Sequence, residues 1–218
     1  MRLIDDLTDE HRLIEAVVGS LRTWAQAWAR GEGDVADGRA YLRFFRRWAG
    51  DFHHAREEAV LFEALVRELA LPRERGPIAV ITRDHGEMAA LLNELEQQLG
   101  SPDAAARCRV DELATAYSRQ LWHHIDAEGT VLFPESDVRL SRAGCAALTG
   151  RAPTEEERAA KAEGEALLAR FPPFEDPDVF RGEGCILCPA YGATCDGLER
   201  EWWSESEWEE LHDRLANM

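Results

Sequence analysis

Apolar residues recur at helical spacing through four long segments of the first 134 residues, and short polar or glycine-containing stretches separate these segments. Residues three, four and seven positions apart lie on one face of an α-helix, so each segment predicts an amphipathic helix. The short connections favour antiparallel neighbours, and the sequence therefore predicts an all-α, up-down-up-down four-helix bundle. The expected helices run from Thr8 to Arg30, from Val35 to Ala70, from Pro77 through Leu99, and from the cap Ser101-Pro102-Asp103 through Leu132.

The second of these segments does not keep one helical period along its length. The face that carries His53 and Glu57 is nearly opposite the face that carries the aromatic residues Tyr41, Phe45, Trp48 and Phe52. Two interpretations account for this pattern. Either the helix has a bulge near Gly50, or the aromatic residues form a second, outward face that another part of the chain covers.

Histidine and glutamate fall on the apolar stripes of all four predicted helices. His11 lies on the first stripe and His85 lies in the middle of the third. The second and fourth helices each carry the spacing His-x-x-x-Glu ahead of a Leu-Phe pair, and the two copies are His53 with Glu57 and His124 with Glu128. Side chains four residues apart are neighbours on a helix surface, so each copy can bring an imidazole and a carboxylate to one metal ion.

Burying these groups without a cation would be expensive. Taking one charged group out of water costs several kcal/mol, whereas the net stability of a domain is only about 5–15 kcal/mol. Taken singly, a histidine on an apolar stripe is more often a hydrogen-bonded core residue, and a lone His-x-x-x-Glu is commonly a surface pair. Their combination on four helices predicts a metal site for two bridged ions. The candidate ligands are His11, His53, His54, Glu57, His85, His124 and Glu128.

Composition narrows the choice of metal, partner and compartment. Imidazole and carboxylate without thiolate suit iron, manganese or zinc. The 218 residues carry a formal net charge of -17, which argues against nucleic acid and anionic membranes as partners. The N-terminus has no apolar signal region, and no apolar run is long enough to cross a membrane, so we expect a soluble cytoplasmic protein. Five cysteines fit reduced thiols or metal ligands better than a disulfide framework.

The arrangement of the histidines resembles that of a known family. The residues concerned are Asp9-Glu10-His11-Arg12, His53-His54 with Glu57-Glu58 and Leu61-Phe62, Asp84-His85, and His124 with Glu128 and Leu132-Phe133-Pro134. On these motifs the region from about Ile4 to Pro134 resembles a hemerythrin-like (HHE cation-binding) domain. The resemblance implies a non-haem di-iron centre held by the seven candidate ligands, which binds dioxygen, nitric oxide or peroxide.

The chain departs from the oxygen carriers of that family in two places. Ala89 stands where they have a second histidine on the third helix, and His124-x-x-x-Glu128 replaces their His-x-x-x-x-Asp. One ion is therefore expected to have an open or carboxylate-rich position. Two functions stay open: a protein that binds or senses oxygen, redox state or iron, and a di-iron oxidoreductase that acts on a small organic substrate. Tyr117, one heptad before His124, could reach a ligand of the metal, although a buried core tyrosine is the more common case.

Beyond Pro134 the composition changes, and we divide the chain into a bundle at residues 1–135, a helical linker at 136–173 and a Cys/Trp-rich acidic tail at 174–218. Residues Ser136 to Leu148 are expected to form a short helix. Thr154 with Glu157 predicts a capping box that starts another helix, which ends before Phe171.

The tail contains a cysteine pattern of its own. Cys185-x-x-Cys188 among glycines, with Cys195 seven residues later, is typical of a metal knuckle. Three thiolates and a fourth ligand, for which Cys145 and His212 are candidates, would complete a tetrahedral zinc site that stabilises the tail. A redox dithiol, an iron–sulfur cluster and unligated thiols are the alternatives.

Tryptophans follow these cysteines at Trp202, Trp203 and Trp208. We expect them to cover the aromatic face of the second helix, which would make the tail part of the same globule. The alternative is a docking surface for another protein. Cys108, alone near the start of the fourth helix, is expected to be a buried small residue.

Overall fold

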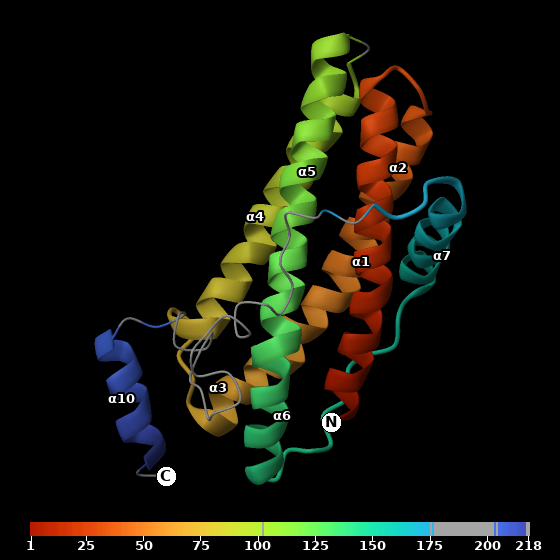
Figure 1. The fold of residues 1–218 in the computed structure, drawn as a ribbon. Helices are drawn as coiled ribbons and strands as arrows, with labels where there is room; N and C mark the ends of the chain where they lie inside the picture. The colour runs from red at the N-terminus through yellow and green to blue at the C-terminus, as the bar shows by residue number, and fades with distance from the viewer. Residues whose placement is uncertain (102, 175, 177–202, 204, 217–218) are drawn as a thin grey trace.

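The computed structural model describes residues 1–101, 103–174, 176, 203 and 205–216. All regular structure within these residues is helical. Helices α1 (Arg2–Ala29), α4 (Gly76–Leu99) and α5 (Ala104–Ala127) lie lengthwise beside a further helical rod (Figure 1). The predicted all-α four-helix bundle is confirmed.

The second rod changes its helical form along its length. It consists of α2 (Val35–Arg43), the π-helices η1 (Phe44–His54) and η2 (Glu57–Phe62), and α3 (Glu63–Leu69). Gly50 lies within η1, so the bulge predicted near it is present as a long π-helical stretch. A π-helical turn contains more residues than an α-helical turn, and this change of period is what the conflicting sequence faces reflect. The rod ends at Ala70, which adopts a left-handed φ of 53°.

The fourth rod is longer than the sequence suggested. The side chain of Asp103 caps α5 by accepting a hydrogen bond from the backbone of Ala106 at 2.7 Å, as predicted. After α5 the rod continues through the π-helix η3 (Glu128–Leu132) and α6 (Phe133–Arg142). The short helix predicted over Ser136 to Leu148 is present as α6, which begins three residues earlier, at Phe133, and ends at Arg142. Pro134 does not end the rod, because its missing N–H falls where the π-helical turn passes into α6.

Helix α7 (Glu155–Arg170) begins with the predicted capping box between Thr154 and Glu157 and ends before Phe171. It covers the aromatic residues of the second rod. The ring of Phe171 lies 6.4 Å from that of Tyr41, and Lys161 lies 5.3 Å from the ring of Trp48. Helices α6 and α7 thus occupy residues 133–142 and 155–170, and α7 is a packed part of the bundle.

The tail lies elsewhere. Trp203 packs against Gly76 at the start of α4, and helix α10 (Glu205–Ala216) contributes Glu210, which pairs with Arg75 at 2.8 Å. The predicted cover of the aromatic face by the tail is therefore wrong for the part of the tail that is described, because α7 occupies that position. Cys108 is exposed, which corrects the expectation of a buried residue.

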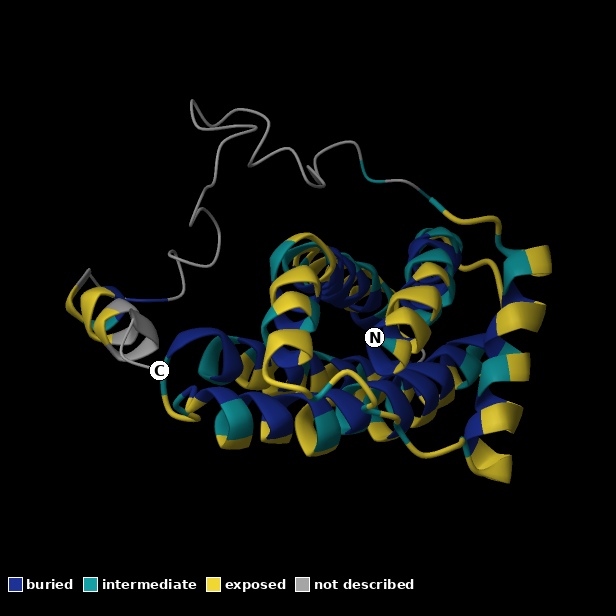
Figure 2. Ribbon diagram, turned by 90° about the horizontal axis from the view of Figure 1, so that it is seen from below, coloured by how far each residue is buried: buried dark blue, intermediate teal, exposed yellow. Residues whose placement is uncertain are grey.

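The buried side chains form two apolar clusters with a polar layer between them. Viewed along the bundle, buried residues face the shared interior and exposed residues face outward (Figure 2). On α1, Leu7 belongs to one cluster and Ile14 to the other. On α4 the corresponding residues are Ile81 and Met88. Among the described helices, none is both long enough and apolar enough to pass through a membrane.

Candidate metal centre

The polar layer between the two apolar clusters contains all seven residues that the sequence predicted as metal ligands. Six of them are less than a tenth exposed, and His54 is partly buried. Two of the six, Glu57 and Glu128, are 0% exposed. The seven fall into two groups of four whose potential ligand atoms lie within 4.8 Å of one another, and Glu57 belongs to both groups.

The first group consists of His11, His53, Glu57 and Glu128. His53 Nε2 lies 3.1 Å from Glu57 Oε1, which is the contact expected of a His-x-x-x-Glu pair on one helix face. His11 Nε2, from α1, lies 3.2 Å from Glu128 Oε2, which comes from η3. Three rods thus converge on this group.

The second group consists of His54, Glu57, His85 and His124. His85 Nε2 lies 3.4 Å from Glu57 Oε2 and 3.2 Å from His124 Nε2. The rings of His54 and His85 are stacked, with centroids 4.0 Å apart. This group takes its residues from η1, η2, α4 and α5.

Both carboxylates lie between the two groups. Glu57 presents Oε1 to His53 and Oε2 to His85. Glu128 Oε2 lies 3.2 Å from His11 Nε2 and 3.3 Å from His124 Nε2. A carboxylate placed in this way can contact two cations at once.

Three of these histidines each have a different carboxylate near their second ring nitrogen, Nδ1. His53 Nδ1 is 2.9 Å from Glu10 Oε2, and His85 Nδ1 is 2.7 Å from Glu58 Oε1. Such carboxylates fix the ring orientation and leave Nε2 available to a metal. The third pair, His124 Nδ1 with Asp84 Oδ2, is 3.9 Å apart.

The sequence patterns did not single out Glu10 and Asp84 for this supporting role. The signal was present, because Glu10 directly precedes His11 and Asp84 directly precedes His85. Each carboxylate, however, approaches a histidine on a different rod. Adjacency in sequence could not show which histidine it would meet. Arg56 also donates a hydrogen bond to Glu10 and lies over the ring of Phe52.

Burial and the neighbouring charges shift the pKa values of several residues of the centre in opposite directions. Burial lowers the pKa of His53 and of His85, but the neighbouring carboxylates outweigh burial and raise each pKa to about 9. Burial raises the pKa of Glu128 well above its usual value, and the charge of Glu57 adds to this effect. His53 and His85 therefore favour their protonated forms at neutral pH, so a metal would compete with these protons.

The donor atoms themselves fit a metal. Nε2 of His11 and of His53 and both carboxylate oxygens of Glu57 and of Glu128 are buried, and none has a well-formed hydrogen bond. A buried polar atom without a partner costs about 1–3 kcal/mol. Imidazole nitrogens and carboxylate oxygens are ligands of iron, manganese and zinc, and coordination would satisfy all six atoms.

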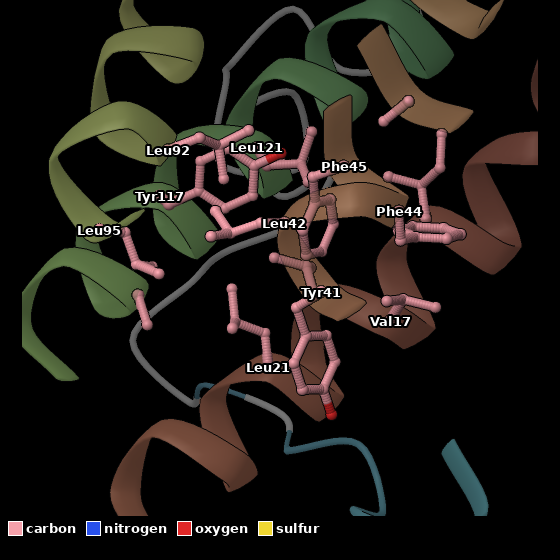
Figure 3. Close-up of a cluster of buried hydrophobic side chains, with 14 of the residues drawn as sticks. Val17, Leu21, Tyr41, Leu42, Phe44, Phe45, Leu92, Leu95, Tyr117 and Leu121 are labelled. Carbon is pink, nitrogen blue, oxygen red and sulfur yellow. The ribbon is translucent and has the colours of Figure 1, made fainter. Parts of the chain in front are cut away.

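A cleft of about 740 Å³ leads to the second group of ligands. It lies between α2 and η1 on one side and α4 on the other, and we call it the α2–α4 cleft. His54 and His85 line it, whereas His11 and His53 do not. Its floor contains Leu42, Phe45, Leu92 and Tyr117, which gather between the rods in Figure 3.

Two residues that the sequence singled out also line this cleft. Tyr117 is buried, and burial raises the pKa of its hydroxyl. Ala89, which stands where the oxygen carriers have a histidine, contributes to the wall one turn beyond His85. The structure thus places Tyr117 and Ala89 in the same cavity as His54 and His85.

The predicted tail site falls mostly outside the described part of the chain. Cys185, Cys188 and Cys195 lie outside the described residues. His212 belongs to α10, but its side chain is not among those described. Cys145, the other candidate ligand, is partly buried and packs beside the lower of the two apolar clusters, the one that contains Leu7 and Ile81.

Comparison with known proteins agrees with this geometry. Residues 2–136 match the sequence model of the hemerythrin HHE cation-binding domain. Searches of curated proteins and of solved structures give no match. The matched region covers α1 through the first turn of α6 and contains all seven candidate ligands. The chain therefore belongs to the hemerythrin HHE cation-binding family.

Proposed function

We propose that the domain holds a non-haem di-iron centre and binds dioxygen, nitric oxide or peroxide, in a role in sensing or handling oxygen, redox state or iron. The observation that carries this proposal is the position of Glu57, whose two oxygens face different groups of histidines. Two complete ligand groups that share a carboxylate fit a pair of ions better than a single ion.

The donor types support iron among the metals that this family can bind. The ligand groups contain only imidazole and carboxylate, and no cysteine lies in either group. Such donors suit iron, manganese and zinc, and we assign iron because the family resemblance implies a di-iron centre. Iron in this setting would supply reversible electron transfer and an open position for a small ligand.

The two ligand groups have different access to solvent. His54 and His85 of the second group line the α2–α4 cleft, while His11 and Glu128 of the first group do not. A small ligand would therefore approach from the side of the second group. Ala89 leaves room there, since a methyl group replaces the imidazole that would otherwise occupy the wall.

A second function, a di-iron oxidoreductase of the oxidase or peroxidase type, is supported by the size of the same cleft. About 740 Å³ is far more than a diatomic molecule needs and falls within the usual range for small organic ligands. Tyr117 in the cleft wall would then contact the substrate or hold a proton beside it. This activity is the alternative to simple ligand binding.

Zinc in the tail is a separate proposal. Cys185, Cys188 and Cys195, with Cys145 or His212, would supply its ligands, and the tail would then stabilise α10 or contact a protein partner. Elemental analysis of the full chain and of a Cys185→Ser, Cys188→Ser variant tests it. Loss of one zinc per chain with unchanged iron supports the site, and unchanged zinc contradicts it.

Metal analysis combined with ligand binding tests the main proposal. Protein purified without oxygen should contain two iron ions per chain, and its visible spectrum should change when dioxygen or nitric oxide is added. Replacement of His85 by alanine should remove the spectral change. Protein that takes up zinc or manganese in preference to iron, or that holds one ion per chain, would contradict it.

A further inference from the structure

The residues that line the α2–α4 cleft indicate which class of ligand would fit it. Its floor is apolar: Phe45, Met88 and Leu92 line it and are buried in the core. Four arginines from the second rod line its rim, Arg39, Arg43, Arg46 and Arg47, together with the carboxylates of Asp51, Glu58 and Glu96. The arginines of this lining outnumber its carboxylates by one, in a chain with a net charge of -17. An apolar floor with a basic rim suits an amphipathic anion.

The four arginines are not equally available. Arg43 pairs with Glu163 of α7 at 2.7 Å, and Arg47 pairs with Asp51 at 2.8 Å. These two guanidinium groups are therefore largely neutralised by their own carboxylates.

The other two arginines lie at the end of the cleft away from His54 and His85. Arg46 pairs with Glu96 at 2.8 Å and donates to Asn93 at 2.9 Å. Arg39 lines the same end and has no ion-pair partner in the part of the chain that is described. Two guanidinium groups thus share one carboxylate, which leaves excess positive charge for a ligand.

The distance between the two ends sets the length of that ligand. On α4 the cleft runs from His85 to Glu96, roughly 16 Å along a helix that rises about 1.5 Å per residue. A straight alkyl chain of medium length spans most of this distance. Met88 and Leu92 lie on the α4 side of the floor between the two ends.

We infer that the α2–α4 cleft binds a medium-chain monocarboxylate, with its carboxylate at Arg39 and Arg46, its alkyl chain on Phe45, Met88 and Leu92, and its far end beside His54 and His85. The inference rests on the proposed function only for the role of that far end, which would lie next to the metal pair. The cleft itself belongs to the folded chain.

Isothermal titration calorimetry with the full-length protein and decanoate tests the inference. Decanoate should bind with one site per chain, and decylammonium, which has the same chain and the opposite charge, should bind at least tenfold more weakly. The double variant Arg39→Gln, Arg46→Gln should weaken decanoate binding on the order of tenfold or more. Arg30→Gln, at an exposed ion pair outside the cleft, should leave it unchanged.

A second pair of variants tests the location. Ala89 lines the cleft, whereas Ala90 is equally exposed on α4 and does not. Ala89→Trp should abolish decanoate binding, and Ala90→Trp should preserve it. Equal affinity for decanoate and decylammonium would overturn the inference. Equal effects of the two tryptophan variants on decanoate binding would also overturn it.

Iron analysis of the same samples separates this inference from the proposed function. Decanoate binding by protein that takes up no iron would refute the di-iron proposal and leave the cleft assignment standing. Protein with two iron ions that binds no decanoate would refute the cleft assignment alone.

Discussion

His53 and His54 are consecutive residues, yet they belong to different ligand groups of the metal centre. Their ring centroids lie 5.5 Å apart, with 59° between the ring planes. Both rings reach the interior from the end of η1, where the π-helical turn contains more residues than an α-helical turn. The irregular helix thus lets one short segment contribute candidate ligands to both groups.

Replacement of His54 by alanine should therefore remove one metal and spare the other. The first group, with His11, His53, Glu57 and Glu128, stays complete in this variant. We expect the metal content to fall from two ions to about one per chain, measured by mass spectrometry of the elements. His123→Ala is the matched control, because His123 is exposed beside His124 and should not affect the content. Equal losses in both variants would contradict the assignment.

Glu57→Gln should affect both metals. The amide keeps the shape of the side chain but loses the charge and one of the two oxygens that face the histidine groups. We expect less than one ion per chain after dialysis, measured in the same way. Glu63→Gln lies on the same rod at an exposed ion pair with Arg73 and should keep two ions. A Glu57 variant that keeps both ions would show that the carboxylate does not bridge them.

The carboxylates that contact histidine Nδ1 atoms should affect the affinity for metal but not the number of metal ions bound. Glu10 contacts His53 Nδ1 and Glu58 contacts His85 Nδ1. Loss of such a partner typically costs about 10–100-fold in metal affinity. Glu10→Gln and Glu58→Gln should each weaken metal binding by such a factor in competition with a chelator, while saturation still gives two ions. Unchanged affinity would mean that these contacts do not orient the rings.

Much of this architecture could be predicted from the sequence. The apolar stripes predicted the bundle and the inward positions of His11 and His85. The repeated His-x-x-x-Glu spacing predicted four further candidate ligands, because it too depends on local helical periodicity. The long π-helix could be predicted only as one of two alternatives. An extra residue per turn places the aromatic residues and the His53/Glu57 pair on different predicted faces, and so does a second buried face. The cover of that face by α7 depends on contacts between Phe171 and Tyr41, far apart in the chain, which no local pattern specifies.

The docking of α7 gives a packing prediction. A side-chain carbon added to Gly164 would lie 2.3 Å from the buried ring of Phe44, whereas one added to Gly86 on α4 would meet nothing within 4 Å. Gly164→Ala should lower the free energy of unfolding by about 1–3 kcal/mol through overpacking. Gly86→Ala should raise it by about 0.5–1 kcal/mol through helix propensity. Chemical denaturation measures both, and equal changes would contradict the close contact.

The start of α7 should respond to acid. A hydrogen bond from Arg151, with further bonds from Thr154, lowers the pKa of Glu157 to about 2. A lowered carboxyl pKa stabilises the fold above the pKa of the unfolded chain, and this contribution is lost as pH falls from about 4.5 towards 2. Glu157→Gln should therefore be less stable than wild type by about 1–2 kcal/mol at pH 7.

That difference should shrink as the pH is lowered through this window. Denaturation of both proteins at pH 7, 4 and 2.5 measures it, and comparing the two proteins at each pH removes effects of acid on the rest of the chain. Glu155→Gln is the control, because Glu155 is exposed and pairs only with exposed Arg158. A difference that is independent of pH would contradict the role of the Glu157 charge.

In the proposed centre, two ions share Glu57 in the layer between the apolar clusters. Anomalous X-ray diffraction from crystals of the iron-loaded protein, collected on both sides of the iron absorption edge, tests it most directly. We expect two peaks, one beside His11 and His53 and one beside His85 and His124, with Glu57 in contact with both. A single peak, or two peaks outside this layer, would contradict it.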